Sequence, residues 1–318
     1  MRRDPLKSDV LSRMHTYDSP LKGVNPLTAS HAALRRHGLP NRPNPKTSPS
    51  LARLWKEVFA RPTTFVKAEL AIDPIMSGRD PLPAANTEFG PGDWAGVAVQ
   101  TATLGFGEPA KWVFAEWVVP HVSAVDPAGY DQIAVGFWVG LDGLASLGDQ
   151  VLQAGIAAYV DPGLWSTDVN WYAWIEWYTK AHEDPAVNVA NFPVAPGDTV
   201  SFLVCAPQPD LGHITMLNRT QGALTSVDIN APAGTTSLGA SAEWIVEQVT
   251  PVFPNFHKVT FTSCVAGTEN HLFDLTSGGA MDITGPGSGP YGSPITQTFV
   301  AFPNLFVVQW KDWGIPPF

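Results

Sequence analysis

The chain is 318 residues long and has a formal net charge of −10, with 15% charged residues, 11% aromatic residues, 28 Gly and 30 Pro. This composition is typical of many short strands joined by tight turns, and it predicts an all-β protein. No stretch approaches the roughly 18 uninterrupted apolar residues that a membrane-spanning helix requires, which argues against a membrane protein.

The charge is divided unevenly along the chain. Residues 1–80 contain 14 of the 19 Lys and Arg but 7 of the 29 Asp and Glu, a net charge of +7 that leaves −17 for the remainder. Such a basic segment should be attracted to its own acidic body at neutral pH, and less so in acid, where carboxylates become protonated. A tail that binds nucleic acid is the alternative, but the acidic body would repel phosphates. We therefore expect an intramolecular partner and no nucleic acid.

The basic segment is predicted to hold one helix. Residues 1–48 are rich in Pro, Arg, Ser and His without sustained periodicity, so little fixed structure is expected there. Residues 50–61 have apolar side chains at helical spacing, with Ser50 as the expected N-cap and Pro62 as the stop. The apolar positions are Leu51, Leu54, Trp55, Val58 and Phe59. An amphipathic helix should therefore dock on the body.

Short alternating runs separated by turn residues follow a Pro/Gly-rich stretch that ends near residue 92. Evenly spaced strands without helical patterns between them predict an antiparallel β-sandwich or barrel rather than a βαβ fold. Residues 283–294 read as a surface loop. The predicted strands span residues 93–100, 111–120, 134–143, 149–160, 169–178, 198–207, 213–218, 241–249 and 257–265.

The sequence shows no pattern for metal, serine or cysteine catalysis. The eight His residues are scattered, without HxH, HExxH or a Cys/His cluster, and the serine elbow GxSxG is absent. Cys205 and Cys264 end apolar alternating runs, so we expect two buried free thiols and no disulfide scaffold. Neither a metal nor a cofactor is expected.

The run WYAWIEWY, residues 171–178, stands out among the strands. Tyr172, Trp174, Glu176 and Tyr178 share one face of a strand. A carboxylate among aromatic side chains is unusual for a core, because a buried Glu is costly unless it is paired. This face is predicted to be the wall of a cleft.

The run AEWIVE, residues 242–247, places Glu243 and Glu247 on one face of another strand. A single strand carboxylate is more often a solvated surface group, and Gln153, in VLQAG, would alone more often be a structural amide. The residue pattern by itself therefore leaves their roles open.

These residues and their order resemble the glutamic peptidases, or eqolisins, over residues 92–266. The shared elements in chain order are DWAG (93–96), WVVP (117–120), FWVGLDG (137–143), LQAG (152–155), AWIEWY (173–178), PGDTV (196–200), LNRT (217–220) and AEWIVE (242–247). The ordered combination is far more specific than any one of its pieces. The resemblance implies a concanavalin A-like lectin/glucanase sandwich and an acid endopeptidase.

The resemblance also implies roles for individual residues. Gln153 matches the catalytic glutamine and Glu247 the catalytic glutamate, with Glu243 as the nearest competitor for the acid role. A glutamate can act as general base and then general acid on water, while a glutamine amide can stabilise the oxyanion. Further residues match the lining of the substrate cleft, namely Trp138, Asp142, Trp174, Glu176 and Tyr178.

The same resemblance implies a prosegment. Residues 1–85 would form a basic, Pro-rich prosegment that acts as an intramolecular partner, and residues 86–318 a monomeric peptidase domain whose substrate is a polypeptide. Secretion is expected from the resemblance, although residues 1–20 contain no apolar leader run.

Two positions depart from the family pattern. Ala157 and Tyr172 stand where family members carry aspartates, which removes carboxylates near the cleft. A catalytically inactive relative, or a carbohydrate- or protein-binding module that uses the aromatic strip, is therefore the alternative function.

Overall fold

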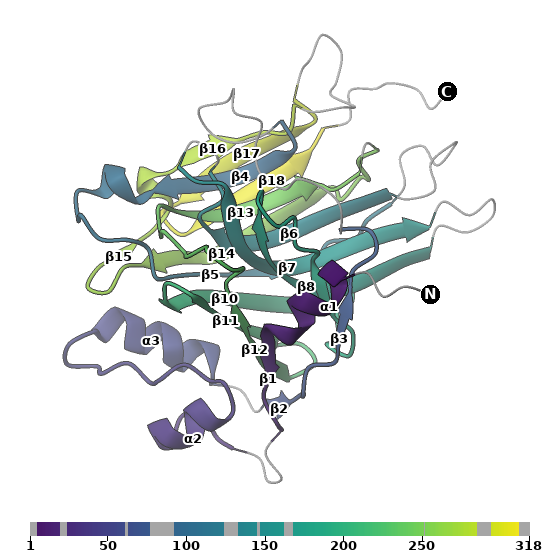
Figure 1. The fold of residues 1–318 in the computed structure, drawn as a ribbon. Helices are drawn as coiled ribbons and strands as arrows, with labels where there is room; N and C mark the ends of the chain where they lie inside the picture. The colour runs from purple at the N-terminus through teal and green to yellow at the C-terminus, as the bar shows by residue number, and fades with distance from the viewer. Residues whose placement is uncertain are drawn as a thin grey trace, which may run out of the picture.

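The computed structural model describes residues 5–19, 24–60, 63–76, 92–123, 133–144, 147–161, 168–250, 252–284 and 294–311. Its architecture is two β-sheets packed face to face (Figure 1). Strand pairs are antiparallel in both sheets, apart from the short β2, which runs parallel to β12. The predicted all-β antiparallel sandwich is confirmed.

The first sheet has the strand order β1-β12-β11-β10-β5-β14-β18-β17, with β2 beside β12 and β15 beside β14. Its strands are β1 (Met14–Thr16), β2 (Thr64–Phe65), β5 (Trp112–Val118), β10 (Thr199–Gln208), β11 (Leu211–Asn218), β12 (Ala223–Asn230), β14 (Lys258–Gly267), β15 (Leu272–Phe273), β17 (Thr296–Phe302) and β18 (Leu305–Trp310).

The second sheet has the strand order β16-β4-β13-β6-β7-β8-β9-β3. Its strands are β3 (Leu70–Ile72), β4 (Trp94–Gln100), β6 (Ile133–Leu141), β7 (Gln150–Asp161), β8 (Asp168–Thr179), β9 (Val187–Val189), β13 (Ser241–Gln248) and β16 (Gly279–Met281). The nine predicted runs correspond to β4, β5, β6, β7, β8, β10, β11, β13 and β14.

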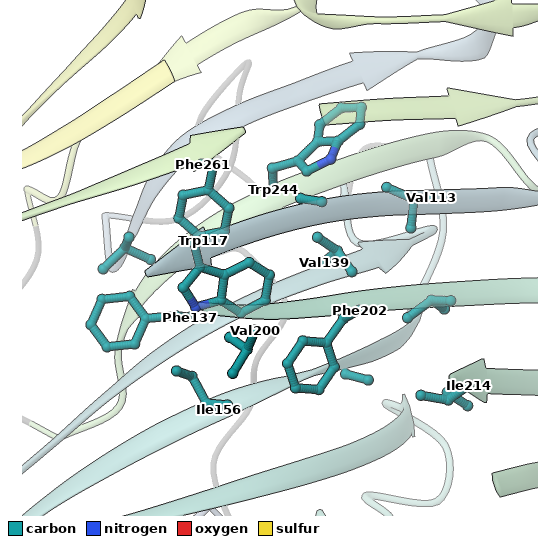
Figure 2. Close-up of a cluster of buried hydrophobic side chains, with 14 of the residues drawn as sticks. Val113, Trp117, Phe137, Val139, Ile156, Val200, Phe202, Ile214, Trp244 and Phe261 are labelled. Atoms are coloured by element: carbon teal, nitrogen blue, oxygen red, sulfur yellow. The ribbon is translucent and has the colours of Figure 1, made fainter. Parts of the chain in front are cut away.

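The main core lies between the sheets, where alternate side chains of each strand point inward (Figure 2). In the first sheet the ring centroid of Trp117 is 5.2 Å from that of Phe202 and 4.8 Å from that of Phe261. Trp244 of the second sheet donates a hydrogen bond from its indole to the carbonyl oxygen of Phe114 at 2.9 Å. The aromatic rings thus pack within the first sheet, and the Trp244 hydrogen bond links the two sheets directly.

The N-terminal extension, residues 5–76, is built into this sandwich. β1 pairs with β12 at one edge of the first sheet, and β3 pairs with β9 at an edge of the second sheet. Val10 is fully buried in the main core. The expectation that residues 1–48 have little fixed structure is wrong for the described part, because edge strands and apolar contacts with the body order segments that show no local periodicity.

The helices of the extension are α1 (Pro5–Ser12), α2 (His31–Arg36) and α3 (Pro49–Val58), and two short 3₁₀ helices follow later in the chain, η1 (Thr101–Leu104) and η2 (Leu275–Ser277). None of the helices among the described residues is long and apolar enough to cross a membrane. α2 and α3 lie beside the β10–β12 side of the first sheet (Figure 1).

The predicted amphipathic helix is α3, which docks on the body as expected. Its Trp55 is buried in a cluster with Leu217 and Leu224 of the first sheet. The predicted N-cap is corrected, because Ser50 lies inside the helix and Ser48 occupies the cap position, with Pro49 in the first turn. Proline favours that place because its fixed φ suits the helix and its missing N–H costs nothing there. The predicted stop, Pro62, lies outside the described residues.

Candidate active site

The outer face of the second sheet, directed away from the main core, carries the predicted site residues. On β8, Ala173, Ile175 and Trp177 enter the main core, which leaves Trp174 and Glu176 on the outer face. The same alternation places the polar residues of β7 and β13 on this face, namely Gln153, Glu243 and Glu247.

Cross-strand register determines which of these side chains meet. Gln153 on β7 lies opposite Glu176 on β8 and, on its other side, opposite Gly140 on β6. Gly140 in turn lies opposite Glu243 on β13. Because glycine has no side chain, Glu243 and Gln153 face each other across Gly140, from strands about 10 Å apart.

Glu247 lies in a different cross-strand row. It is opposite Gly136 on β6, and Gly136 is opposite Ala157 on β7. Glu247 is four positions after Glu243 in the sequence, which is about 13 Å along a strand. The register therefore places Glu243, and not Glu247, in the cross-strand row of Gln153. Alternation alone could not distinguish the two glutamates, because both lie on the same face.

The side-chain amide of Gln153 is fixed by one neighbour and open on the other side. Its Nε2 donates a hydrogen bond to Glu176 Oε2 at 2.6 Å, and the residue is fully buried. Its Oε1 is buried without a hydrogen-bond partner. Buried polar atoms are nearly always satisfied, so an unpaired oxygen here indicates a place for a water molecule or a substrate group.

The carboxyl group of Glu243 is also fully buried, and its Oε1 accepts a hydrogen bond from the backbone N–H of Gly143 at 3.2 Å. Its Oε2 makes no hydrogen bond of good geometry. Burial raises the pKa of Glu243 well above its ordinary value, and the nearby charge of Asp142 adds to this effect. Hydrogen bonding by the Ser241 side chain and the Gly143 backbone N–H lowers the pKa by less. A carboxyl group with a raised pKa suits general acid–base chemistry.

Glu247 instead supports the aromatic part of the face. Trp138 donates from its indole Nε1 to Glu247 Oε2 at 2.9 Å. The ring of Trp138 also meets Trp94 edge-on, with the ring centroids 4.8 Å apart. Trp138 and Trp174 are fully buried and Tyr178 nearly so. The aromatic strip is thus a packed cluster rather than an exposed platform for stacking sugars.

Asp142 serves the loop that precedes β13. It has a positive φ of 72°, and its carboxylate accepts hydrogen bonds from the Ser237 hydroxyl and from the backbone N–H groups of Leu238 and Ala240 at 2.7–2.8 Å. The carboxylate of Asp142 thus fixes the loop by hydrogen bonds, and its charge contributes to the raised pKa of Glu243.

The extension reaches the outer face through residues 73–76, which we term the covering segment. Tyr159 of β7 donates a hydrogen bond from its hydroxyl to the carboxylate of Asp73. Met76 is fully buried in the cluster that contains Trp94, Trp138 and Trp174. The covering segment therefore occupies part of the face on which Gln153 and Glu243 lie.

An open groove of about 500 Å³ continues along this face beyond the covering segment. Its walls include Tyr159, Tyr172, Asn170 and Asn188 of the sheet together with Pro74 of the extension. Asn188 Oδ1 is buried there without a hydrogen-bond partner. The groove offers a path for an extended chain with polar backbone groups to satisfy this oxygen.

Several contributors to the site were missed in the sequence. Gly140 carried no signal for its role as a spacer, which depends on cross-strand register. Trp94 lies in the DWAG element and Tyr159 lies four residues after LQAG, but neither was assigned to the site. Asp73 lies in the extension, outside the stretch that resembles the peptidases. Within the part of the chain that the structure describes, no group of three or more His, Cys, Asp and Glu could hold a metal ion.

The sequence profile of the Peptidase A4 family matches residues 92–301, about two thirds of the chain. The chain belongs to the peptidase A4 family. This eqolisin membership confirms the resemblance drawn from the sequence and makes the chain a peptidase-family protein of the hydrolase class. No curated protein sequence matches the chain significantly.

Solved structures show the same fold. A scytalido-glutamic peptidase with a transition-state analog inhibitor is 20% identical, with a TM-score of 0.54, and the match covers 69% of this chain and 98% of that one. SCP-B, an eqolisin-family member in complex with the tripeptide Ala-Ile-His, is 20% identical, with a TM-score of 0.52 and the same coverage. Aspergilloglutamic peptidase from Aspergillus niger is 25% identical, with a TM-score of 0.47 and coverage of 56% and 99%. At 20% identity the first two matches establish the eqolisin fold.

Proposed function

We propose that this A4-family protein is an acid endopeptidase in which Gln153 and Glu243 carry the chemistry. The observation that supports the pair is their shared cross-strand row, in which Gln153 Oε1 is buried without a hydrogen-bond partner. A water molecule held between an amide oxygen and a carboxylate is positioned to attack a peptide carbonyl.

The proposed reaction divides the work between the two side chains. Glu243 takes a proton from the water while the water oxygen bonds to the carbonyl carbon, and the second Nε2 hydrogen of Gln153 stabilises the oxyanion that forms. Glu243 then returns the proton to the amine nitrogen as the C–N bond breaks, which regenerates the carboxylate. Glu176 holds the amide of Gln153 in the required orientation through the 2.6 Å hydrogen bond.

Casein hydrolysis tests the proposed function. Purified protein should degrade casein at pH 3–4, once the extension has detached and water admitted to the face has lowered the pKa of Glu243, and not at pH 7, where the docked extension covers the face. Mass spectrometry identifies the peptide products. A folded protein that leaves casein intact at both pH values, even after its extension has been removed by limited proteolysis, would show that the chain is a catalytically inactive relative.

Gly140, which lies between Gln153 and Glu243 in the cross-strand row, gives a sharper test of the site geometry. A Cβ atom at Gly140 would lie 3.1 Å from Gln153 Cβ and 3.0 Å from the ring of Trp138, whereas a Cβ at Gly136 would meet nothing closer than 3.6 Å. Gly140→Ala should therefore displace Gln153 and lower kcat/KM at least about tenfold, since small misplacements are costly in catalysis. Gly136→Ala is the matched control on the same strand and face and should change kcat/KM less than about threefold. Equal activity of the two variants would contradict the proposed role of the Gln153 row.

We further propose that the extension is a prosegment, with the peptidase domain beginning near residue 86. Support comes from the covering segment on the outer face and from the edge strands that the extension adds to both sheets. Among the described residues, one ion pair joins a basic side chain of the extension to an acidic one of the body, Arg13 with Asp184 at 2.8 Å. Docking therefore depends mainly on strand pairing and apolar contacts, with the overall charge asymmetry as a weaker contribution. The predicted boundary at residue 85 lies outside the described residues.

Asp228 of β12 makes the docking sensitive to pH. It accepts a hydrogen bond from the Tyr17 hydroxyl and is paired with His213 Nδ1, both at 2.6 Å, and the charge of His15 is nearby. Burial alone would raise the pKa of Asp228, but the hydrogen bonds from His213 and Tyr17 hold it below the ordinary value of 3.8. The carboxylate thus stabilises docking above about pH 4, and this contribution is lost as the pH falls through the lowered pKa.

Hydrogen exchange at residues 14–16 checks this prediction. After correction for intrinsic rates, the wild-type amides of β1 should lose protection at least about tenfold between pH 7 and pH 3. Asp228→Asn should show a smaller change, because its side chain cannot be protonated in this range. The control is Asp149→Asn, whose carboxylate is exposed and pairs with Lys180 outside the extension. The same pH dependence in all three proteins would contradict the role of Asp228.

A further inference from the structure

A second hollow lies on the opposite side of the molecule from the candidate active site. α3 sits over the outer face of the first sheet and leaves a cavity of about 140 Å³ beneath it. The floor includes Phe114, Leu203 and Cys205 from neighbouring strands, and the roof includes Leu54 and Trp55 of α3. The walls are almost entirely apolar, as in many small-molecule sites.

One polar group in the wall lacks a partner. Ser201 lies two residues before Leu203 and four before Cys205 on β10, so the three side chains point to the same face. Its side chain is 2% exposed, and its Oγ has no hydrogen-bond partner. The other hydroxyl of the lining, that of Thr215, is engaged with Ser226 at 3.0 Å. A buried, unsatisfied hydroxyl in an apolar wall is a specific place for a ligand's polar atom.

The dimensions limit what the cavity can hold. An engineered apolar cavity of roughly 150 Å³ in another protein binds benzene, so about 140 Å³ suits a ligand of one ring or a short alkyl chain and is too small for a peptide segment. Leu51, Leu54 and Val58 are only partly buried, which leaves a route from solvent between the helix and the sheet.

We propose that this cavity is a binding site for a small apolar molecule that carries one hydroxyl group, with the hydroxyl bound to Ser201 Oγ and the apolar body between α3 and the sheet. Because the roof belongs to the extension and the floor to the body, such a ligand binds only while the extension is docked. It should therefore stabilise the docked state by mass action. The proposal concerns a site remote from the peptidase chemistry and does not depend on it.

Calorimetric titration of the full-length chain tests the site, with p-cresol as the hydroxylated probe and toluene as its matched apolar control. Wild-type protein should bind p-cresol saturably and about five- to tenfold more tightly than toluene. Ser201→Ala should abolish this preference while retaining toluene binding, and Leu203→Trp should remove binding of both by filling the cavity. Absence of saturable p-cresol binding to the folded wild-type protein would overturn the proposal, and an unchanged preference in Ser201→Ala would overturn the role of Ser201.

Alkylation of the wild-type protein provides a measurement that needs no variant. Cys264 is fully buried, whereas Cys205 is partly exposed at the cavity, which corrects the expectation of two buried thiols. Burial raises the pKa of the Cys205 thiol to about 12, so alkylation should be slow and is followed at pH 9. Iodoacetamide should still modify Cys205 before Cys264, and saturating p-cresol should slow that reaction at least about fivefold without changing the rate for an added free thiol. An unchanged rate at Cys205 at a p-cresol concentration that saturates binding would place the bound molecule elsewhere and overturn the assignment.

Discussion

Replacement of Glu243 by glutamine should reduce peptide hydrolysis by about 100- to 10,000-fold, the range expected when a general acid–base group is removed. The substitution keeps the size and shape of the side chain and its hydrogen bond from Gly143, but it removes the group that accepts and returns the proton. The measurement is kcat/KM for a fluorogenic peptide across pH 2–7, with the fold checked by near-UV circular dichroism.

Glu247→Gln is the matched control for this experiment. It makes the same chemical change on the same strand and face, but in the row of Gly136 and Ala157, where the carboxylate accepts the indole hydrogen bond of Trp138. An amide oxygen can still accept that bond, so less than about a tenfold loss is expected. A large loss in Glu247→Gln with near-normal activity in Glu243→Gln would reverse the assignment and restore the pair inferred from the sequence alone.

Low activity of Glu243→Gln could arise because the extension is not removed or because the peptide bond is not hydrolysed, and the two causes must be separated. Glu243→Gln should also remain full length in acid if the prosegment is removed by the protein itself. The variant should therefore be shortened with a trace of tagged wild-type protein, repurified without it, and assayed again. Low activity after this step locates the defect in the chemistry rather than in maturation.

The pKa of Glu243 offers an independent readout of the covered state. Burial is the largest cause of its raised pKa, and a neutral carboxyl cannot act as a base. Departure of the covering segment should admit water to the face and lower the pKa of Glu243. The acid limb of the kcat/KM profile should therefore lie at lower pH in protein without the extension than in full-length protein.

Much of the fold could be predicted because the strands of the body alternate regularly. Runs such as residues 169–178 and 241–249 specify both their secondary structure and which side chains share a face. Residues 5–19 and β3 could not be predicted in this way, because they become ordered by adding edges to sheets whose neighbouring strands are far away in the sequence.

The sequence predicted which side chains share the outer face of the sheet, but not which of them lie next to each other. Alternation brings Gln153, Glu243 and Glu247 to one side of the sheet, but the choice of partner depends on how β13, β6 and β7 are aligned. Register results from long-range pairing and turn geometry, and a shift of four residues leaves every local pattern unchanged. The position of Gly140 between Gln153 and Glu243 is visible only once that register is known.

The departures at Ala157 and Tyr172 acquire a structural meaning from the covering segment. The two residues are opposite each other on β7 and β8, and the ring of Tyr172 lies against Tyr159 with the centroids 5.3 Å apart. At these two positions the chain offers an apolar and phenolic surface, and the Tyr159 hydroxyl donates a hydrogen bond to Asp73 of the extension. The carboxylate near this position is thus supplied by the extension itself.

Met76→Asp should release the covering segment and raise the initial rate of peptide hydrolysis at pH 5 by at least about tenfold. Met76 is fully buried among aromatic side chains, and a carboxylate there would be unpaired, at a cost of several kcal/mol. The segment lies at the end of an edge strand, so it can detach without unfolding the sheets. Ala60→Asp, at an exposed position of the extension, is the control with the same charge change. If Met76→Asp stays folded and shows the same lag and initial rate as Ala60→Asp, the covering segment does not restrict access to Gln153 and Glu243, and the extension must act on the peptidase by another route.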